Sequence, residues 1–125
     1  MARVVLFRKG GLRSQRMPFI AGDIVSVATD DGKFGVMKIL AVDDAGIHTR
    51  LYVQRFAERP RLADISELST APFGPENGNP LSIGHLPLTH DGFAIWQPEV
   101  ITNRLVREEE LMGYRMWQKA QGGYF

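Results

Sequence analysis

Residues 22–56, GDIVSVATDDGKFGVMKILAVDDAGIHTRLYVQRF, alternate between runs rich in β-branched residues and short polar turns. The run 24–29 favours a β-strand because branched side chains fit a pleated surface. Asp31-Gly32 then predicts a hairpin turn, since glycine adopts positive φ without penalty. The return strand, residues 34–42, is apolar on both faces except at Lys38. Such a strand is covered on both sides, which predicts a central place in the sheet.

A third strand is predicted over residues 47–56, after a turn at residues 43–46, because its side chains alternate with a period of two. The residues of one face are Ile47, Thr49, Leu51 and Val53. The residues of the opposite face are His48, Arg50, Tyr52 and Gln54. We expect an antiparallel meander with the first row inside and the second row facing outward.

The rest of the chain adds shorter elements. We expect a short helix over residues 62–68, a Pro- and Gly-rich loop over 72–80, a strand over 81–88, a turn over 90–92 and a strand over 93–96. Residues 99–106 fit a strand or a helix equally well.

A helix is predicted over residues 108–120, with glutamates at its N-terminus and a stripe of Leu111, Tyr114 and Trp117 that can pack on the sheet. The expected fold is therefore mainly β (α+β). It is a bent antiparallel meander or a small SH3-like barrel, with the C-terminal helix packed on it. The 125 residues fit a single domain, 1–125.

Composition excludes some classes of site. The chain has no cysteine, so it has no disulfides and no thiolate metal site. The longest apolar run near the N-terminus, residues 4–7, is shorter than a secretory signal needs, and no stretch has the length of a membrane span. We therefore expect a cytoplasmic protein that does not contact membrane.

The charge is uneven along the chain. Residues 1–17 form a basic leader that contains five basic residues and no acidic residue, whereas the remainder has 10 basic and 14 acidic residues. The basic residues of the leader are Arg3, Arg8, Lys9, Arg13 and Arg16. They fit first a solvated arm or an edge strand followed by a loop, and as the alternative a binding site for phosphate or an acidic partner.

No pattern for catalysis or for a cofactor is visible. The histidines, His48, His85 and His90, lack metal-ligand spacing, and the aspartate pairs at 30–31 and 43–44 suit turns. The serines lack a nucleophile elbow, and no glycine-rich phosphate loop is present. We expect no catalytic residue, no metal and no cofactor. A deep pocket joining His85 or His90 to a carboxylate would favour an enzyme instead.

Two groups of residues are candidates for partner binding. His48, Arg50 and Tyr52 combine the aromatic and arginine side chains that are enriched at protein interfaces. The alternative for this row is an ordinary solvent face or a face covered by the C-terminal helix. Glu108, Glu109 and Glu110 form an acidic patch, which we expect to face a basic partner.

The segment FIAGDIVSV (19–27) and the segment DGKFGVMKIL (31–40) carry a family resemblance. They resemble the opening hairpin of mainly-β immunity proteins of bacterial polymorphic toxin systems, which often begin with Gly-Asp, a β run, an Asp-Gly turn and a glycine-bearing return strand. The resemblance implies a cytoplasmic, non-catalytic protein that neutralises a cognate toxin by binding it.

The same hairpin also resembles the start of an SH3-like barrel of the KOW kind, with Gly35 as the glycine of the return strand. That resemblance implies an RNA-, ribosome- or DNA-associated module that uses the basic leader. Residues 18–64 depart from this pattern because they carry six basic and seven acidic residues, whereas nucleic-acid modules show a basic face. An inhibitor of immunity or antitoxin type is therefore the first expectation, the nucleic-acid module the second and an enzyme the third.

Overall fold

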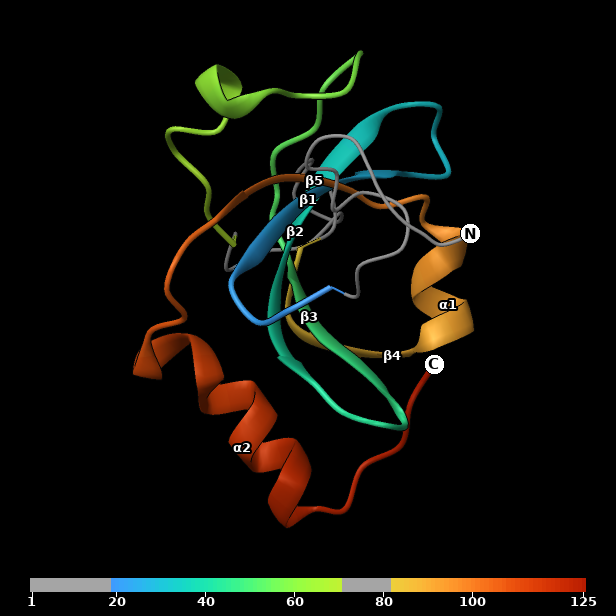
Figure 1. Ribbon diagram of the computed structural model, residues 1–125, viewed down its shortest axis with the longest axis vertical. Coiled ribbons are helices and arrows are strands. Elements are labelled where there is room, and N and C mark those ends of the chain that lie inside the picture. The colour runs from blue at the N-terminus through green and yellow to red at the C-terminus, as the bar shows by residue number, and fades with distance from the viewer. Residues whose placement is uncertain (1–18, 71–81) are drawn as a thin grey trace, which may run out of the picture.

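The computed structural model describes residues 19–70 and 82–125 (Figure 1). The strands are β1 (Asp23–Ala28), β2 (Phe34–Val42), β3 (Gly46–Leu51), β4 (Ile83–Thr89) and β5 (Glu99–Asn103). They form one sheet in the order β4-β3-β2-β1-β5, with every neighbouring pair antiparallel. The mainly β class and the meander are confirmed, and β2 is the central strand.

The turn between β1 and β2 has the predicted chemistry. Gly32 has a φ of +80°, and the Asp31 carboxylate accepts a hydrogen bond from the Lys33 backbone amide at 3.0 Å. Val25 then pairs with Met37 across the hairpin. The turn residues therefore set the register that places both apolar rows of β2 against neighbouring layers.

Two apolar layers cover the two faces of the sheet. The larger core consists of Val25, Val27, Met37, Ile39, Ile47, Leu51, Leu88 and Phe93. The smaller core consists of Ile24, Val36, Tyr52 and Ile65. Adjacent residues of β2, Val36 and Met37, belong to different cores, as the double apolar pattern predicted.

The segment after β4 differs from the prediction. Residues 90–92 and 93–96 were expected as a turn and a strand, but His90–Ile95 form helix α1. The Thr89 hydroxyl caps it by accepting a hydrogen bond from the Gly92 amide at 2.9 Å. Phe93 is buried and Ile95 is exposed. The short apolar run is therefore one turn of an amphipathic helix, which periodicity over so few residues cannot distinguish from a strand.

Two other predicted elements are shorter than expected. The third strand ends at Leu51, and the helix predicted over residues 62–68 is a single 3-10 turn, η2 (Leu62–Asp64). The ambiguous stretch 99–106 contains β5. The basic leader 1–17 and the loop 72–80 lie outside the described residues.

The C-terminal helix is confirmed as a 3-10 turn, η4 (Glu108–Leu111), followed by α2 (Met112–Lys119). Gly113 allows the helix to approach β4 closely, since a Cβ there would lie 2.7 Å from the Cβ of His85. After α2 the chain runs back across the molecule and ends beside α1, where the Phe125 carbonyl accepts a hydrogen bond from the Thr89 amide (Figure 1). Among the described residues, no helix combines the length and apolarity needed to span a membrane.

Candidate functional site

The predicted contact row, on β3 and on Tyr52 directly after it, is mostly buried. His48 is 0% exposed and Tyr52 6% exposed, whereas Arg50 is half-buried. The two rows of β3 do lie on opposite faces, because Ile47 and Leu51 belong to the larger core. The expectation that the second row faces solvent is nevertheless wrong for His48 and Tyr52. Segments distant in sequence, including α2 and residues 104–110, form a second layer over that face.

A cleft of about 660 Å³, here called the Tyr52 cleft, opens between that face and the segment that leads from β5 to η4. Its lining residues are Ile24, Lys38, Arg50, Tyr52, Ser66, Leu68, Arg104, Leu105, Arg107, Glu109 and Glu110. The lining includes four of the residues predicted for partner binding, Arg50, Tyr52, Glu109 and Glu110. The structure therefore brings side chains from the two predicted groups, one at the end of β3 and the other on η4, into one site.

The floor of the cleft is a buried ion pair. Lys38 donates hydrogen bonds to the Leu105 carbonyl at 2.8 Å and to Glu110 at 3.0 Å. Glu110 also accepts a hydrogen bond from the Arg107 backbone amide, and Arg50 lies 3.8 Å away. Burial alone would raise the pKa of Glu110, but these hydrogen bonds and charges outweigh it and lower the pKa. Glu110 is therefore an ionised, fully paired carboxylate.

The other two predicted glutamates also have basic partners on the same chain. Glu109 lies 3.7 Å from Arg107, and both side chains are exposed. Glu108 accepts a hydrogen bond from Arg115 at 2.7 Å and is not part of the cleft lining. The three glutamates are thus balanced locally, and the lining of the Tyr52 cleft has four basic and two acidic side chains.

Tyr52 lies beneath these charges. Burial raises the pKa of its phenol to about 12, and Glu110 adds to the effect, while Arg50 and Arg104 oppose it. The hydroxyl is therefore protonated at neutral pH and can donate a hydrogen bond. Lys38, Arg104 and Arg107 were missed as site residues. Only Lys38 had a sequence signal, as the one charge in an apolar strand.

A second polar cluster, here called the His48 network, holds the C-terminal segment. The Nδ1 atom of His48 lies 3.0 Å from Nε2 of His85. The Nε2 atom of His48 lies 3.2 Å from Oδ2 of Asp43 and 3.0 Å from the hydroxyl oxygen of Tyr124. The Tyr124 hydroxyl donates to Asp43 at 2.7 Å. All contacts are satisfied when His85 Nε2–H donates to His48 Nδ1 and His48 Nε2–H points toward Asp43.

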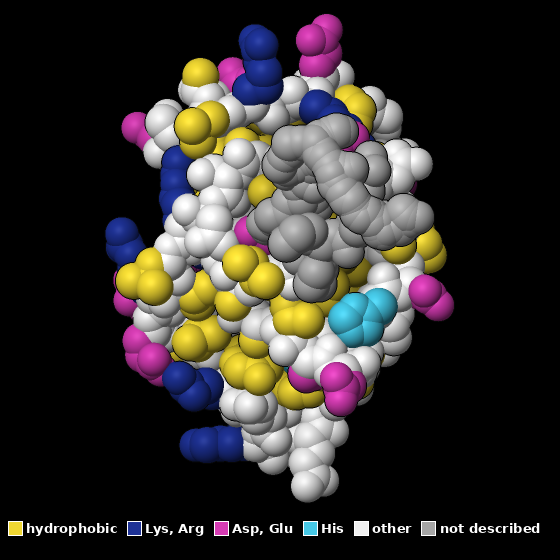
Figure 2. Space-filling model, viewed as in Figure 1, with side chains coloured by type: hydrophobic (Ala, Val, Ile, Leu, Met, Phe, Trp, Pro, Cys, Tyr) yellow, Lys and Arg dark blue, Asp and Glu magenta, His cyan; other side chains and the backbone are white. Residues whose placement is uncertain are grey.

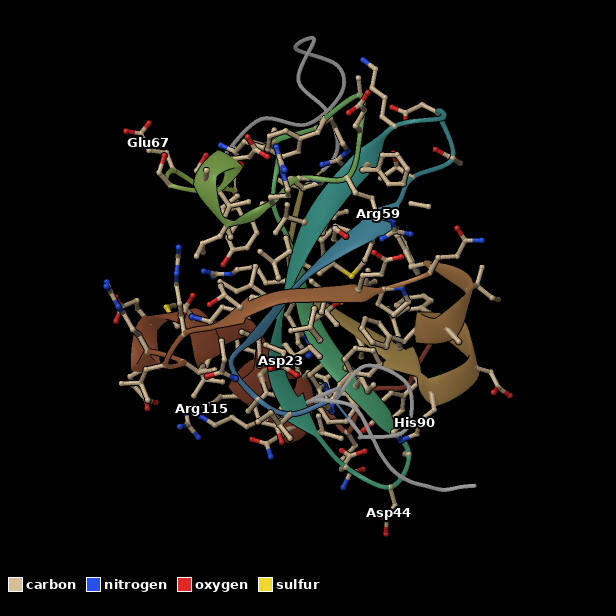
Figure 3. All side chains as sticks on the ribbon, turned by 45° about the horizontal axis from the view of Figure 1, so that its top comes forward. Asp23, Asp44, Arg59, Glu67, His90 and Arg115 are labelled. Atoms are coloured by element: carbon tan, nitrogen blue, oxygen red, sulfur yellow. The ribbon has the colours of Figure 1, made fainter. Side chains whose placement is uncertain are left out.

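Aromatic rings surround the network. The ring centroids of Tyr114 and Trp117 lie 4.6 Å and 4.5 Å from that of His48. His90 donates from Nε2 to the Asp43 carbonyl at 2.9 Å, and Figure 3 shows His90 and Asp44 at the same end of the molecule. His48 and His90 therefore contact Asp43 in the turn between β2 and β3, and His85 is linked to that turn through His48. The sequence predicted only a turn role for Asp43.

The network suits structural cross-linking better than catalysis. Both nitrogens of His48 already have partners, and its ring is fully buried, so it offers no free nitrogen to a substrate. Burial would raise the pKa of Asp43, but hydrogen bonds from Tyr124, Gly46 and His48 outweigh it and lower the pKa to about 2. No group of three or more potential ligands able to hold a metal occurs among residues 19–70 and 82–125.

Acid is expected to destabilise the protein through His85. Burial, reinforced by His48, lowers the pKa of His85 from 6.5 to about 4. Between pH 6.5 and pH 4 the unfolded chain therefore binds more protons at His85 than the folded protein does. The contribution of neutral His85 to stability is complete above pH 6.5 and is lost as the pH falls toward 4. We expect urea unfolding to show a loss of about 1–2 kcal/mol between pH 7 and pH 4.5, since water screens the partly exposed ring.

His85→Gln is the control for this experiment because glutamine does not titrate. Its free energy of unfolding should vary less over the same pH range. Equal pH dependence in the two proteins would contradict the assignment to His85.

The basic leader residues Arg3, Arg8, Lys9, Arg13 and Arg16 lie outside the described residues, so their role stays a prediction. Comparison with protein-family models, with curated proteins and with solved structures found no match to this chain.

Proposed function

We propose that this protein is a non-catalytic, cytoplasmic protein-binding module, an inhibitor of immunity or antitoxin type that neutralises a cognate toxin. The observation that carries the proposal is the Tyr52 cleft. It combines a buried aromatic side chain, arginines and an exposed apolar rim, which are features of interface centres.

The apolar rim extends beyond the cleft. Leu105, Met112 and Met116 are 85%, 66% and 67% exposed. Figure 2 shows apolar, basic and acidic side chains together along the left margin, where Figure 1 places the segment from β5 to α2. Exposed methionines at a spacing of four residues lie on one face of α2 and suit contact with a protein surface.

The ionisable groups of the cleft favour binding over proton transfer. A general acid or base works best with a pKa near the operating pH. The pKa of Tyr52 is raised to about 12, and the pKa of Glu110 is lowered by its partners. Both groups therefore keep one protonation state near neutral pH, which suits a fixed pattern of hydrogen bonds.

The test is co-expression with the product of the neighbouring gene. If that product arrests growth, the wild-type chain should restore growth and form a complex with it. Reversing the charge of the exposed Arg104 and Arg107 to glutamate should weaken the complex by about ten-fold or more, as expected for contacts near an interface centre. Arg61→Glu is the matched control, because Arg61 is an exposed arginine that does not line the cleft.

Two further outcomes are informative. Reversal of Glu108 and Glu109 to lysine tests separately whether the acidic patch faces a basic partner, and unchanged affinity would refute that contact. Absence of any complex with the neighbouring product, at low and at high salt, would refute the proposed function.

A further inference from the structure

The hydroxyl of Tyr52 is a buried donor that faces a cleft. The residue is 6% exposed, and its hydroxyl makes no hydrogen bond with any residue in the described ranges 19–70 and 82–125. Buried side-chain hydroxyls are normally paired, because an unpaired one loses its bonds to water without replacement. A group from outside the chain that accepts a hydrogen bond would satisfy it.

The charges around this hydroxyl favour an anion. Lys38 is compensated by Glu110, and Arg107 lies beside Glu109. Arg104 forms no ion pair within the described part of the chain. Arg50 donates from Nε to the Gly84 carbonyl at 3.4 Å and lies 3.8 Å from Glu110, which leaves other N–H donors of its guanidinium group available. Two guanidinium groups therefore retain donors that can act on the same ligand as the Tyr52 hydroxyl.

We propose that the Tyr52 cleft binds the carboxylate of an aspartate or glutamate side chain on the protein partner. Arginine presents a planar pair of donors that matches the two oxygens of a carboxylate, and the tyrosine hydroxyl adds a third donor. The inference rests on the proposed function, because it names the chemistry of the partner at the same site.

The surroundings favour an acidic protein side chain over a polyanion. Glu109 and Glu110 line the same cleft and repel a ligand that carries several negative charges. Leu68 and Leu105 give the walls apolar contacts that suit the stem of an amino-acid side chain and its neighbours. A nucleic acid would instead require a continuous basic surface.

The test uses the full chain and short capped peptides as probes. One set places a single aspartate or glutamate between leucines, and the matched set replaces it by asparagine or glutamine. Inorganic phosphate and a single-stranded oligonucleotide are added as competing probes. We expect the carboxylate peptides to bind, and the amide peptides to bind about ten-fold more weakly or not at all.

Two variants locate the binding site. Tyr52→Phe should weaken the carboxylate peptides about ten-fold while leaving the midpoint of urea unfolding unchanged, because the lost hydroxyl has no partner among the described residues. Arg104→Gln changes an exposed side chain and should weaken binding to a similar extent. Arg115→Gln is the control and should bind like the wild type.

The outcomes separate this inference from the proposed function. Equal binding of carboxylate and amide peptides, or unchanged binding by both cleft variants, overturns the inference. The inference is also overturned if phosphate or the oligonucleotide binds more tightly than the carboxylate peptides and the two cleft variants weaken that binding. If the toxin complex forms but tolerates Tyr52→Phe and Arg104→Gln, the proposed function stands and the inference fails. If the peptides bind as expected but no toxin complex forms, the proposed function fails alone.

Discussion

Lys38→Met is expected to lower the free energy of unfolding by about 3 kcal/mol, because it leaves the Glu110 carboxylate buried beside an apolar side chain. Lys38 and Glu110 side chains are only 6% and 12% exposed, so water would compensate the unpaired carboxylate only in part. Arg50 at 3.8 Å compensates part of the charge, which keeps the loss at the lower end of the range for buried pairs. Urea unfolding at pH 7 measures the effect.

The double variant Lys38→Met with Glu110→Gln provides the sharper comparison. It removes the uncompensated charge while keeping an oxygen that can accept from the Arg107 amide, so it should recover most of the lost stability. Lys33→Met changes an exposed lysine of the β1–β2 turn and should alter stability by less than about 0.5 kcal/mol. Equal stabilities for Lys38→Met and Lys33→Met would contradict the buried pair.

His48→Ala is expected to destabilise the protein by about 3 kcal/mol and to loosen the C-terminal segment. The change leaves a cavity beneath Tyr114 and Trp117 and removes the hydrogen-bond partner of His85. Tyr124 keeps its bond to Asp43 but loses the imidazole contact. Faster hydrogen exchange of the amides of Phe125 and Ala120 would show that the segment has loosened.

His90→Ala is the matched control for this variant. His90 is exposed, and within residues 19–70 and 82–125 its ring forms one hydrogen bond, to the Asp43 carbonyl, so its loss should cost about 1 kcal/mol or less. A loss below about 1 kcal/mol for His48→Ala would show that the network contributes little.

The strands of the meander were predictable because side-chain alternation and turn residues act between neighbours in the sequence. The bounds of β2 match the predicted strand 34–42, since a period of two and a flanking Asp-Gly turn are sufficient to define it. The helix α1 was missed for a related reason. Its apolar run is too short for a period of two to be distinguished from a helical one, and the capping role of Thr89 was not recognised.

The side chains of β3 and of Tyr52, which follows it, show what the alternation of residues along a strand cannot predict. Alternation predicted correctly that His48 and Tyr52 lie opposite Ile47 and Leu51, but it could not predict that both are buried. The covering groups of His48, such as Trp117 and Tyr124, come from the end of the chain. A polar residue on a strand gives no indication of whether a second layer will cover it.

The amino-acid order alone was sufficient for the mainly β class, the three-stranded meander and the C-terminal helix, because turn chemistry and hydrophobic periodicity act between near neighbours. Tertiary packing alone created the Tyr52 cleft and the His48 network. Lys38 meets Leu105 and Glu110 across 67 and 72 residues, and His48 meets Tyr124 across 76. Such contacts form only after the sheet has brought distant segments together, because side-chain hydrogen bonds reach only about 3 Å.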